Sequence, residues 1–177
     1  MTLHLDSQDV LEDAVRTLVT QDKRLAPILA ATGMPALRRR EPGFAGIAHI
    51  VCGQQLSTAS AAAIWGRLQA AFDPFDPDAI RRARADRLGR LGLSAAKIKT
   101  LKHIARELGA GRLNLDVLAN EDADAAHATL TALPGIGPWT AGYMLMRGWS
   151  WPDSFPPGDV ILRKALSAQV GGDGPLL

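Results

Sequence analysis

The segment from Leu133 to Thr140 constrains the fold of this chain more than any other stretch. It reads Leu-Pro-Gly-Ile-Gly-Pro-Trp-Thr and stands between two stretches whose apolar residues recur at helical spacing. Gly135 and Gly137 permit a tight turn, because glycine has no side chain to obstruct the backbone. Pro138 suits the first position of a helix, where no backbone N–H is required. We therefore predict two helices joined by a hairpin at 133–140, although an ordinary corner between helices would give a similar pattern.

Helical periodicity extends over nearly the whole chain, and alternating runs of β-branched residues are absent. The expected helices cover residues 7–20, 22–32, 43–53, 57–72, 77–83, 84–91, 94–109, 114–119, 122–132, 138–147 and 159–169. Their expected N-caps are Ser7, Asp22, Ser57, Ser94 and Asp122. The fold class is therefore all-α. We predict one domain over residues 1–177 that forms a two-lobed helical bundle, with the lobes joined near the proline-rich turn at 72–77.

Composition and the cysteine count exclude several classes of protein. Of the 177 residues, 47% are hydrophobic and 21% are charged, which allows a substantial core and argues against disorder. Cys52 is the only cysteine, so an internal disulfide and an iron–sulfur cluster are both excluded. The N-terminus lacks the features of a signal peptide, and no apolar run reaches the roughly 18 residues of a membrane span. We expect a cytoplasmic monomer with no membrane association.

The distribution of positive charge leaves the partner open. The formal net charge is only +2, which is too small to demonstrate nucleic-acid binding. Basic residues nevertheless gather at 38–40, at 81–90 and at 97–102. Each cluster is consistent either with a nucleic-acid contact or with a solvated helix face.

The hairpin itself suits the binding of ions. Its backbone N–H groups, those of Gly135, Ile136, Gly137 and Thr140, are expected to donate to a phosphate group. The carbonyl groups of Leu133 and Gly135 are expected to coordinate a monovalent cation. Contacts of this kind would position a nucleic-acid backbone without reading its sequence.

Asp159 is the candidate catalytic carboxylate. It follows Pro-Pro-Gly and precedes a predicted helix, so a simple N-cap role would also explain it. The two roles are compatible, because the N-terminus of a helix stabilises an ionised carboxylate. Such a carboxylate can stabilise a sugar cation or activate water. The nearest competitor, Asp153, lies in a Pro-containing loop where a role in a turn is favoured.

Trp139 and Tyr143 are the candidate base-binding aromatics. They are four residues apart, so they share one face of the predicted helix after the hairpin. An aromatic pair at this spacing either stacks on a nucleic-acid base or packs in the core.

Taken together, these motifs resemble the helix-hairpin-helix DNA glycosylases, and most closely the bacterial DNA-3-methyladenine glycosylase II branch. The resemblance runs from about residue 20 to residue 170. Besides the hairpin and Asp159, it rests on Gly53-Gln54-Gln55-Leu56-Ser57 with Ala61-Ala62, on Leu93-Ser94-Ala95-Ala96-Lys97, and on the run from Trp139 to Gly148.

The resemblance implies a base-excision-repair enzyme acting on double-stranded DNA. A damaged nucleotide would be flipped into a pocket between the lobes, where Trp139 and Tyr143 favour an electron-poor alkylated purine. Asp159 matches the essential aspartate that supports cleavage of the N-glycosidic bond. Gln55 matches the side chain that fills the gap left by the flipped base. Ser94 and Lys97 are expected to join the hairpin amides in contacting the DNA backbone.

Two further expectations follow from the resemblance. Bifunctional members carry a lysine where this chain has Trp139, so a monofunctional hydrolase that leaves an abasic site is expected. The β-rich N-terminal domain of the best-known bacterial member has no counterpart here. The chain ends at 171–177, where members usually continue into a further helix, which suggests truncation. The alternatives are a non-catalytic DNA-binding protein or inactive truncated relative, a purely structural helical domain, and a glycosylase for other lesions.

Overall fold

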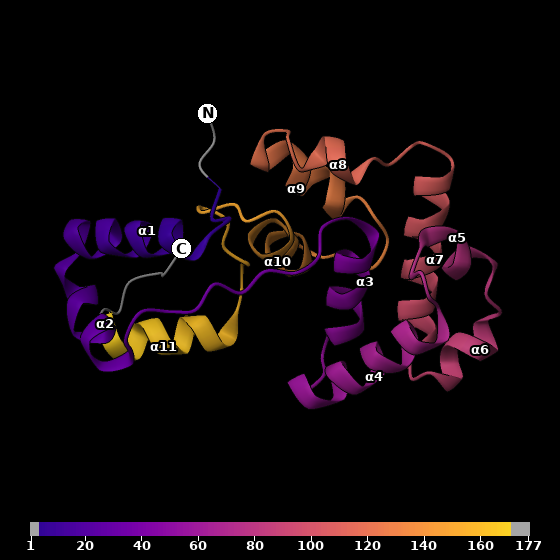
Figure 1. Ribbon diagram of the computed structural model, residues 1–177, viewed down its shortest axis with the longest axis horizontal. Helices are drawn as coiled ribbons and strands as arrows, with labels where there is room; N and C mark the ends of the chain where they lie inside the picture. Colours follow the sequence, from indigo (N-terminus) through magenta and orange to yellow (C-terminus); the bar gives the residue numbers. More distant parts are fainter. Residues whose placement is uncertain (1–3, 171–177) are drawn as a thin grey trace.

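The computed structural model describes residues 4–170, and every regular element in that range is helical (Figure 1). In chain order the elements are α1 (Gln8–Gln21), η1 (Lys23–Leu25), α2 (Ala26–Thr32), α3 (Gly43–Gly53), α4 (Thr58–Ala71), α5 (Pro77–Arg82), α6 (Ala85–Arg90), α7 (Ala95–Gly109), α8 (Leu115–Leu118), α9 (Ala123–Thr131), α10 (Pro138–Gly148) and α11 (Val160–Val170). The predicted all-α fold is confirmed. The expected truncation concerns residues 171–177, which lie outside the described residues.

The helices begin where short polar side chains satisfy their first amide groups. At four of the predicted N-caps, a side-chain oxygen accepts a hydrogen bond from a backbone N–H two or three residues further on. These N-caps are Ser7, Ser57, Ser94 and Asp122. The local signals for these starts are therefore sufficient without any tertiary contact.

The region after Asp22 differs from the prediction of one helix over 22–32. The Asp22 carboxylate accepts from the Arg24 N–H at 3.0 Å and from the Arg24 guanidinium at 2.7 Å. These two bonds hold residues 23–25 in the tighter turn η1, and α2 begins only at Ala26. The prediction of a continuous helix is wrong because it treated Asp22 as the cap of an α-helix.

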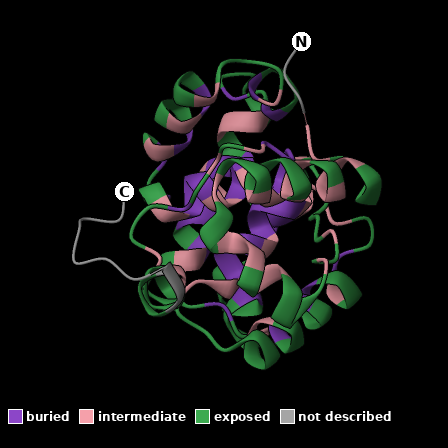
Figure 2. Cartoon of the chain, turned by 90° about the vertical axis from the view of Figure 1, so that its left-hand side faces the viewer, coloured by how far each residue is buried: buried purple, intermediate pink, exposed green. Residues whose placement is uncertain are grey.

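Helix α3 lies at the centre of the core, with α4, α7 and α10 packed around it. Ile47 and Val51 of α3 are fully buried, as are Leu101 and Ile104 of α7 and Met144 of α10. Figure 2 shows this interior in purple beneath largely exposed outer helix faces. The core therefore runs through the middle of the chain, from α3 to α10.

Cys52, near the end of α3, has a buried thiol. Burial raises its pKa to about 12, so it stays protonated at neutral pH and is a poor nucleophile. Ile64 and Leu68 of α4 and Phe72 directly after it, which follow one another at four-residue spacing, are also buried.

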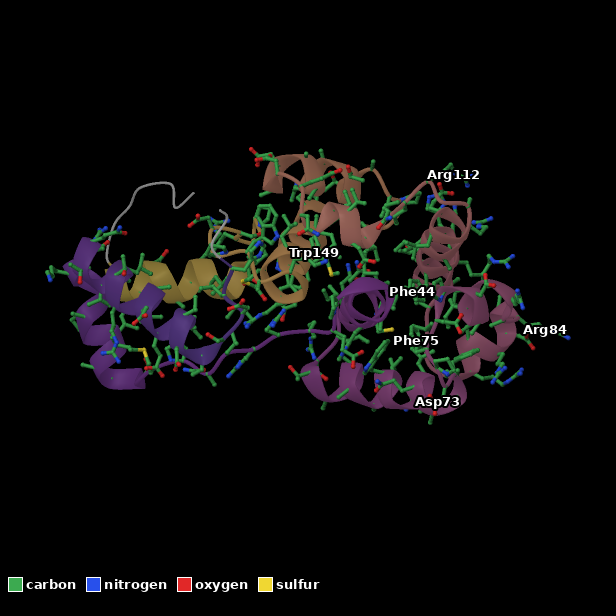
Figure 3. The ribbon with its side chains drawn as sticks, turned by 45° about the horizontal axis from the view of Figure 1, so that its top comes forward. Phe44, Asp73, Phe75, Arg84, Arg112 and Trp149 are labelled. Atoms are coloured by element: carbon green, nitrogen blue, oxygen red, sulfur yellow. The ribbon has the colours of Figure 1, made fainter. Side chains whose placement is uncertain are left out.

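The helices gather in two groups. Helices α1, α2 and α11 lie together at one end of the molecule, and α3 to α10 form the rest (Figures 1 and 3). The chain crosses between the groups at 33–42 and again at 149–159. The Arg40 N–H donates to the Arg147 carbonyl at 2.7 Å, which ties the first crossing to the end of α10.

The proline-rich turn at 72–77 is not the joint between the two groups, and that expectation is wrong. The turn lies inside the larger group, between α4 and α5. The Phe75 ring stacks on Phe44 of α3 at 5.7 Å and meets Trp65 of α4 edge-on at 4.9 Å. Figure 3 shows Phe44 and Phe75 side by side. Aromatic packing therefore fixes this turn to the core, where sequence alone shows only a helix break.

In the described part of the chain, none of the helices has the length and hydrophobicity that crossing a bilayer would require. The same residues contain no group of three or more histidine, cysteine or acidic side chains placed to hold a metal ion. The expected cytoplasmic location and monomeric state stay predictions.

Candidate nucleic-acid interface and carboxylate site

The predicted hairpin is the connection from α9 to α10. Leu133 and Ile136 are buried and anchor it, and the Ile136 N–H donates to the Leu133 carbonyl at 3.0 Å. Gly135 has φ +85°, and a Cβ added there would lie 2.0 Å from the Thr100 hydroxyl of α7. The position therefore requires glycine for two reasons, its backbone conformation and its close approach to α7.

Several backbone amides at the hairpin remain open. Within the described residues, the N–H groups of Gly135, Gly137, Trp139 and Thr140 have no hydrogen-bond acceptor. Pro138 occupies the first turn of α10 and has no N–H to satisfy. The unpaired donors and the helix dipole both favour an anion at this end of α10. Of the four amides predicted to bind phosphate, only that of Ile136 is already engaged.

The Thr140 side chain faces inward, in contrast to its open amide. Thr140 is buried, and its hydroxyl accepts a hydrogen bond from the Gln54 side-chain amide at 3.0 Å. The same amide group donates to the Gly135 carbonyl at 3.2 Å. Gln54 therefore ties the end of α3 to the hairpin. Sequence reasoning gave Gln54 no role, because nothing in the Gln54-Gln55 pair shows which side chain turns inward.

The predicted cation site stays a prediction. Each of its two carbonyl oxygens already accepts one hydrogen bond, Leu133 from the Ile136 N–H and Gly135 from Gln54. A carbonyl oxygen has two lone pairs, so each has one left for a cation. The two carbonyl oxygens are therefore compatible with coordination of a monovalent ion.

Ser94 and Lys97 lie at the N-terminus of α7, beside the hairpin. The Ser94 hydroxyl accepts from the Lys97 N–H at 3.4 Å, as an N-cap does. The Lys97 ammonium group donates to the carbonyl oxygens of Cys52 and Gln54, both at 2.8 Å. The predicted contact of Lys97 with DNA stays untested, and the ammonium group has two partners inside the protein.

Gln55 is exposed in the turn between α3 and α4, where the family resemblance predicts the gap-filling side chain. It has φ +56°, one of only two positive values at a non-glycine residue in the described chain. We call the surroundings of this turn the hairpin junction. It comprises residues 52–55, the N-terminus of α7 at 94–97, and residues 133–140.

Asp159 forms the N-cap of α11 and also contacts the helix after the hairpin. Its Oδ1 accepts from the N–H groups of Ile161 and Leu162, both at 3.0 Å. Its Oδ2 accepts from the Trp139 indole N–H at 2.9 Å. These donors, first the Leu162 N–H and then the indole, hold the pKa of the Asp159 carboxyl below its usual value. The group is only partly buried and stays ionised at neutral pH.

Trp139 and Tyr143 stack on one another, with ring centroids 4.8 Å apart and an angle of 16° between the rings. Both side chains are half-buried, whereas Trp149 and Trp151 of the following segment belong to the core. A base would therefore lie against the outside of the pair rather than between the two rings. The structure thus brings Asp159, Trp139 and Tyr143 together.

Arg147 is a neighbour of this site that sequence reasoning missed. Its guanidinium carbon lies 5.8 Å from the centroid of the Tyr143 ring, and its Nη1 donates to the Arg38 carbonyl at 2.9 Å. Arg147 stands four residues after Tyr143, so helical spacing would have placed it on the same face. It holds a positive charge close to one ring of the aromatic pair.

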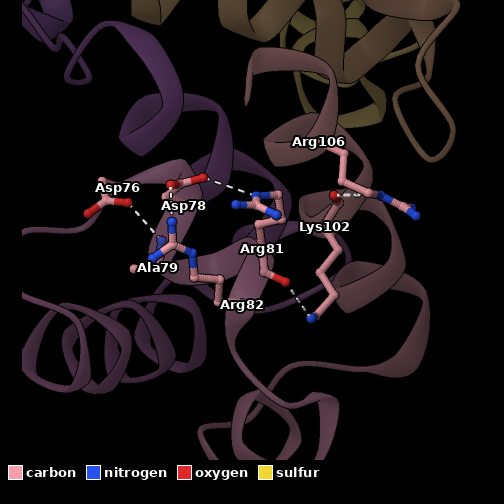
Figure 4. A network of polar contacts seen from close by, with 7 residues as sticks. All are labelled: Asp76, Asp78, Ala79, Arg81, Arg82, Lys102 and Arg106. Atoms are coloured by element: carbon pink, nitrogen blue, oxygen red, sulfur yellow. Dashed lines mark hydrogen bonds and ion pairs between the residues drawn. The ribbon is translucent and has the colours of Figure 1, made fainter. Parts of the chain in front are cut away.

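The basic cluster at 81–90 is largely paired within itself. The arginine-rich end comprises Arg81 and Arg82 of α5, Arg84 directly before α6, and Arg87 and Arg90 of α6. Asp78 lies 3.0 Å from Arg81 and 2.9 Å from Arg82, as Figure 4 shows. Asp86 lies 3.2 Å from Arg84 and 3.0 Å from Arg90. This cluster fits a solvated helix face better than a ready phosphate site.

Other basic groups bind the carbonyl ends of helices. Arg87 donates to the Ala71 carbonyl at 2.9 Å, at the end of α4, and Lys102 donates to the Arg81 carbonyl at 3.0 Å, near the end of α5 (Figure 4). Cations are stabilised there by the unpaired carbonyls and the helix dipole. Several basic side chains therefore bind helix ends within the protein rather than point freely into solvent.

Comparison with known proteins places this geometry in context. Residues 48–172 match the family model described as "HhH-GPD superfamily base excision DNA repair protein". The probable bifunctional transcriptional activator/DNA repair enzyme AlkA of Mycobacterium tuberculosis (strain H37Rv) is 37% identical over 126 residues, 65% of this chain and 25% of that protein. DNA-3-methyladenine glycosylase 2 of Escherichia coli (strain K12) is 33% identical over 125 residues, 64% of this chain and 44% of that protein.

A solved structure gives the same picture at the level of the fold. The DNA-3-methyladenine glycosidase of Bacillus halodurans matches with a TM-score of 0.78 and 29% identity, over 96% of this chain and 76% of that one. The chain spans less than half the length of the two curated relatives above.

Proposed function

The chain belongs to the HhH-GPD superfamily of base excision DNA repair proteins, and on that basis we propose that it releases alkylated purines from double-stranded DNA. The observation that carries this proposal is the Asp159 carboxylate, held ionised against the stacked Trp139–Tyr143 pair. The names of the relatives in E. coli and B. halodurans support 3-methyladenine as a lesion, and 7-methylguanine is proposed with it as another positively charged alkylated purine.

The hairpin junction holds the DNA in this proposal. The open amides of Gly135, Gly137, Trp139 and Thr140 donate to one phosphate group of the backbone. Contacts of this type are independent of sequence, as a repair enzyme that scans DNA requires. The exposed Gln55 side chain enters the stack and fills the gap left by the flipped nucleotide.

The chemistry takes place at the flipped nucleotide. The alkylated base stacks on the outside of the aromatic pair, where the ring quadrupoles favour its positive charge. The glycosidic C1′–N bond breaks, and its electron pair leaves with the base. The Asp159 carboxylate stabilises the resulting oxocarbenium-like sugar, and water adds its oxygen to C1′ and releases a proton to the solvent. The products are the free base and an abasic site.

The absence of a lysine at position 139 makes the reaction a simple hydrolysis. Strand cleavage by the bifunctional enzymes requires an amine that attacks C1′ and forms a Schiff base. Position 139 instead provides an indole N–H, which donates to Asp159. We therefore infer that the enzyme is monofunctional.

Single-turnover release of bases from methylated duplex DNA tests this proposal. Asp159→Asn keeps the size of the side chain and its ability to cap α11, but it removes the negative charge. We expect release to fall by about 10³-fold, or about 4 kcal/mol of transition-state stabilisation, while DNA affinity is retained. A folded parent chain that binds DNA and releases no base would instead support a binding-only role.

A further inference from the structure

The turn that carries Gln55 needs support from its surroundings. Gln55 has φ +56°, a conformation that a side chain with a Cβ rarely adopts, and it is exposed. The turn makes few bonds of its own. The Leu56 N–H donates to the Gly53 carbonyl at 3.2 Å, and the Gln54 N–H donates to the Val51 carbonyl at 3.3 Å. Residues outside the turn must therefore hold it in this conformation.

Lys97 supplies the first of these supports. Its ammonium group donates to the carbonyl oxygens of Cys52 and Gln54, which belong to the three residues that precede Gln55. These carbonyls are at the end of α3, where helix geometry leaves such groups without partners. One cation thus neutralises the negative end of α3 and fixes the backbone on the N-terminal side of Gln55.

Gln54 supplies the second support. Its amide nitrogen donates to the Gly135 carbonyl in the hairpin and to the Thr140 hydroxyl at the start of α10. Gly135 in turn packs on Thr100 of α7, the helix that carries Lys97. The end of α3, the hairpin and α7 are thereby joined in a closed ring of contacts.

We propose that Lys97 is a positioning residue that, together with Gln54, fixes Gln55 relative to the hairpin, and that it does not serve as a phosphate contact. The proposal rests on the proposed function, because it gives Gln55 the role of filling the gap in DNA. Because Gln55 is held at a fixed distance from the hairpin amides, the hairpin junction can bind the DNA backbone and fill the place of the flipped base as one rigid unit.

The test compares Lys97→Met with Lys99→Met in the full chain. Lys99 is an exposed lysine on the same helix, and its ammonium group makes no hydrogen bond to the described residues. For Lys97→Met we expect base release to fall about tenfold and the brightening of a 2-aminopurine lesion analogue on flipping to fall about twofold. Lys97→Arg should recover most of both, and Lys99→Met should change neither.

The salt dependence of DNA binding separates the two roles of Lys97. A lost phosphate contact would reduce the slope of log affinity against log salt by about 0.9. We expect no change in slope for Lys97→Met beyond that of Lys99→Met. A slope reduced by this amount with unchanged flipping, or no change in either property, would overturn the proposal.

Hydrogen exchange in the free protein makes the test independent of enzymatic activity. We expect the Leu56 amide to exchange about tenfold faster in Lys97→Met, while core amides of α7 and α10 keep their protection. If the parent releases no base, the proposed function fails, and exchange still shows whether Lys97 holds the turn. If Lys97→Met does not fold, Gln54→Leu tests the same ring of contacts from its other side, with the same expected changes.

Discussion

The hairpin junction and the arginine-rich end carry different kinds of hydrogen-bond donor that an anion could use. The junction has open backbone amides at the start of a helix and few charged side chains. The arginine-rich end has five guanidinium groups, of which four pair with Asp78 or Asp86. The difference shows that the local density of basic residues does not tell which donors are still open to an anion.

Lys97 sharpens this contrast, since it is a basic side chain inside the junction. Its ammonium group is directed at carbonyl oxygens of α3, in the same way that Arg87 and Lys102 bind the ends of α4 and α5. The fold thus uses several cations to stabilise helix ends, while the backbone amides of the hairpin stay open.

The largest effect on stability is expected for Gly135→Ala. The new Cβ would meet the Thr100 hydroxyl at 2.0 Å, in a backbone conformation with φ +85°. We expect the free energy of unfolding to fall by about 3 kcal/mol, with a loss of DNA affinity as the hairpin shifts. Urea denaturation and a DNA-binding titration measure the two changes.

Gly137→Ala is the matched control, because a Cβ there meets no atom within 4 Å and the backbone has φ −89°. Its cost is expected to stay below about 1 kcal/mol, the usual difference between glycine and alanine at an N-cap. Equal costs at the two positions would mean that the hairpin is not held against α7.

Trp139→Phe is expected to have the next largest effect. Phenylalanine keeps the stacking on Tyr143 but removes the indole N–H that donates to Asp159. Because that bond favours the ionised carboxylate, its loss raises the pKa of Asp159 toward the ordinary value. The acid limb of kcat/KM should therefore move to higher pH. At neutral pH the carboxyl stays ionised without this bond, so the expected fall in release, about tenfold, comes from the lost orientation of the carboxylate by the indole. The measurement is the pH profile of base release.

Trp151→Phe provides the control for this change. The Trp151 indole N–H is buried without a hydrogen-bond partner, and the ring lies in the core. Its removal should leave the acid limb where it is. A shift of similar size in both variants would trace the effect to packing rather than to the bond with Asp159.

The sequence was sufficient for those parts of the fold that depend on local chemistry. The N-caps have short-range causes and the hairpin glycines mark a turn by themselves, so most helix ranges and the hairpin are predictable, whereas the close approach of Gly135 to α7 is not. The position of the joint between the two groups was not, because packing of Phe75 on Phe44 fixes the proline-rich turn inside the larger group. A proline-rich turn looks the same in sequence whether it links two lobes or packs inside one.

The sequence predicted which residues form the site better than it predicted the hydrogen bonds between them. Helical spacing placed Trp139 and Tyr143 on one face, and the cap position marked Asp159. No local signal distinguishes Gln54 from Gln55, since the positive φ that turns them apart arises from tertiary contacts. Likewise, a lysine in a basic run gives no sign that it caps another helix.

Removing the acidic partners of the arginine-rich end is expected to create binding that the native chain lacks. Asp78→Asn combined with Asp86→Asn frees four guanidinium groups, so non-specific DNA affinity at low salt should rise about threefold to tenfold. These ion pairs are exposed and contribute little to stability, so the fold should survive. The control is Asp116→Asn with Asp124→Asn, which changes the net charge equally at exposed residues of α8 and α9. An equal gain in the control would mean that only net charge matters.

The smallest effect is expected from neutralising the arginines themselves. Arg82→Gln, Arg84→Gln and Arg90→Gln together remove three charges, each already paired with a carboxylate. If these residues contacted phosphates, the slope of log affinity against log salt would fall by about 2.7. We expect a change below about 1, because we propose that the contacts to DNA come from uncharged amides at the junction. A change above about 2 would mean that the arginines contact DNA after all. Phosphate groups would then replace the Asp78 and Asp86 carboxylates as their partners, and the arginine-rich end would bind DNA together with the hairpin junction.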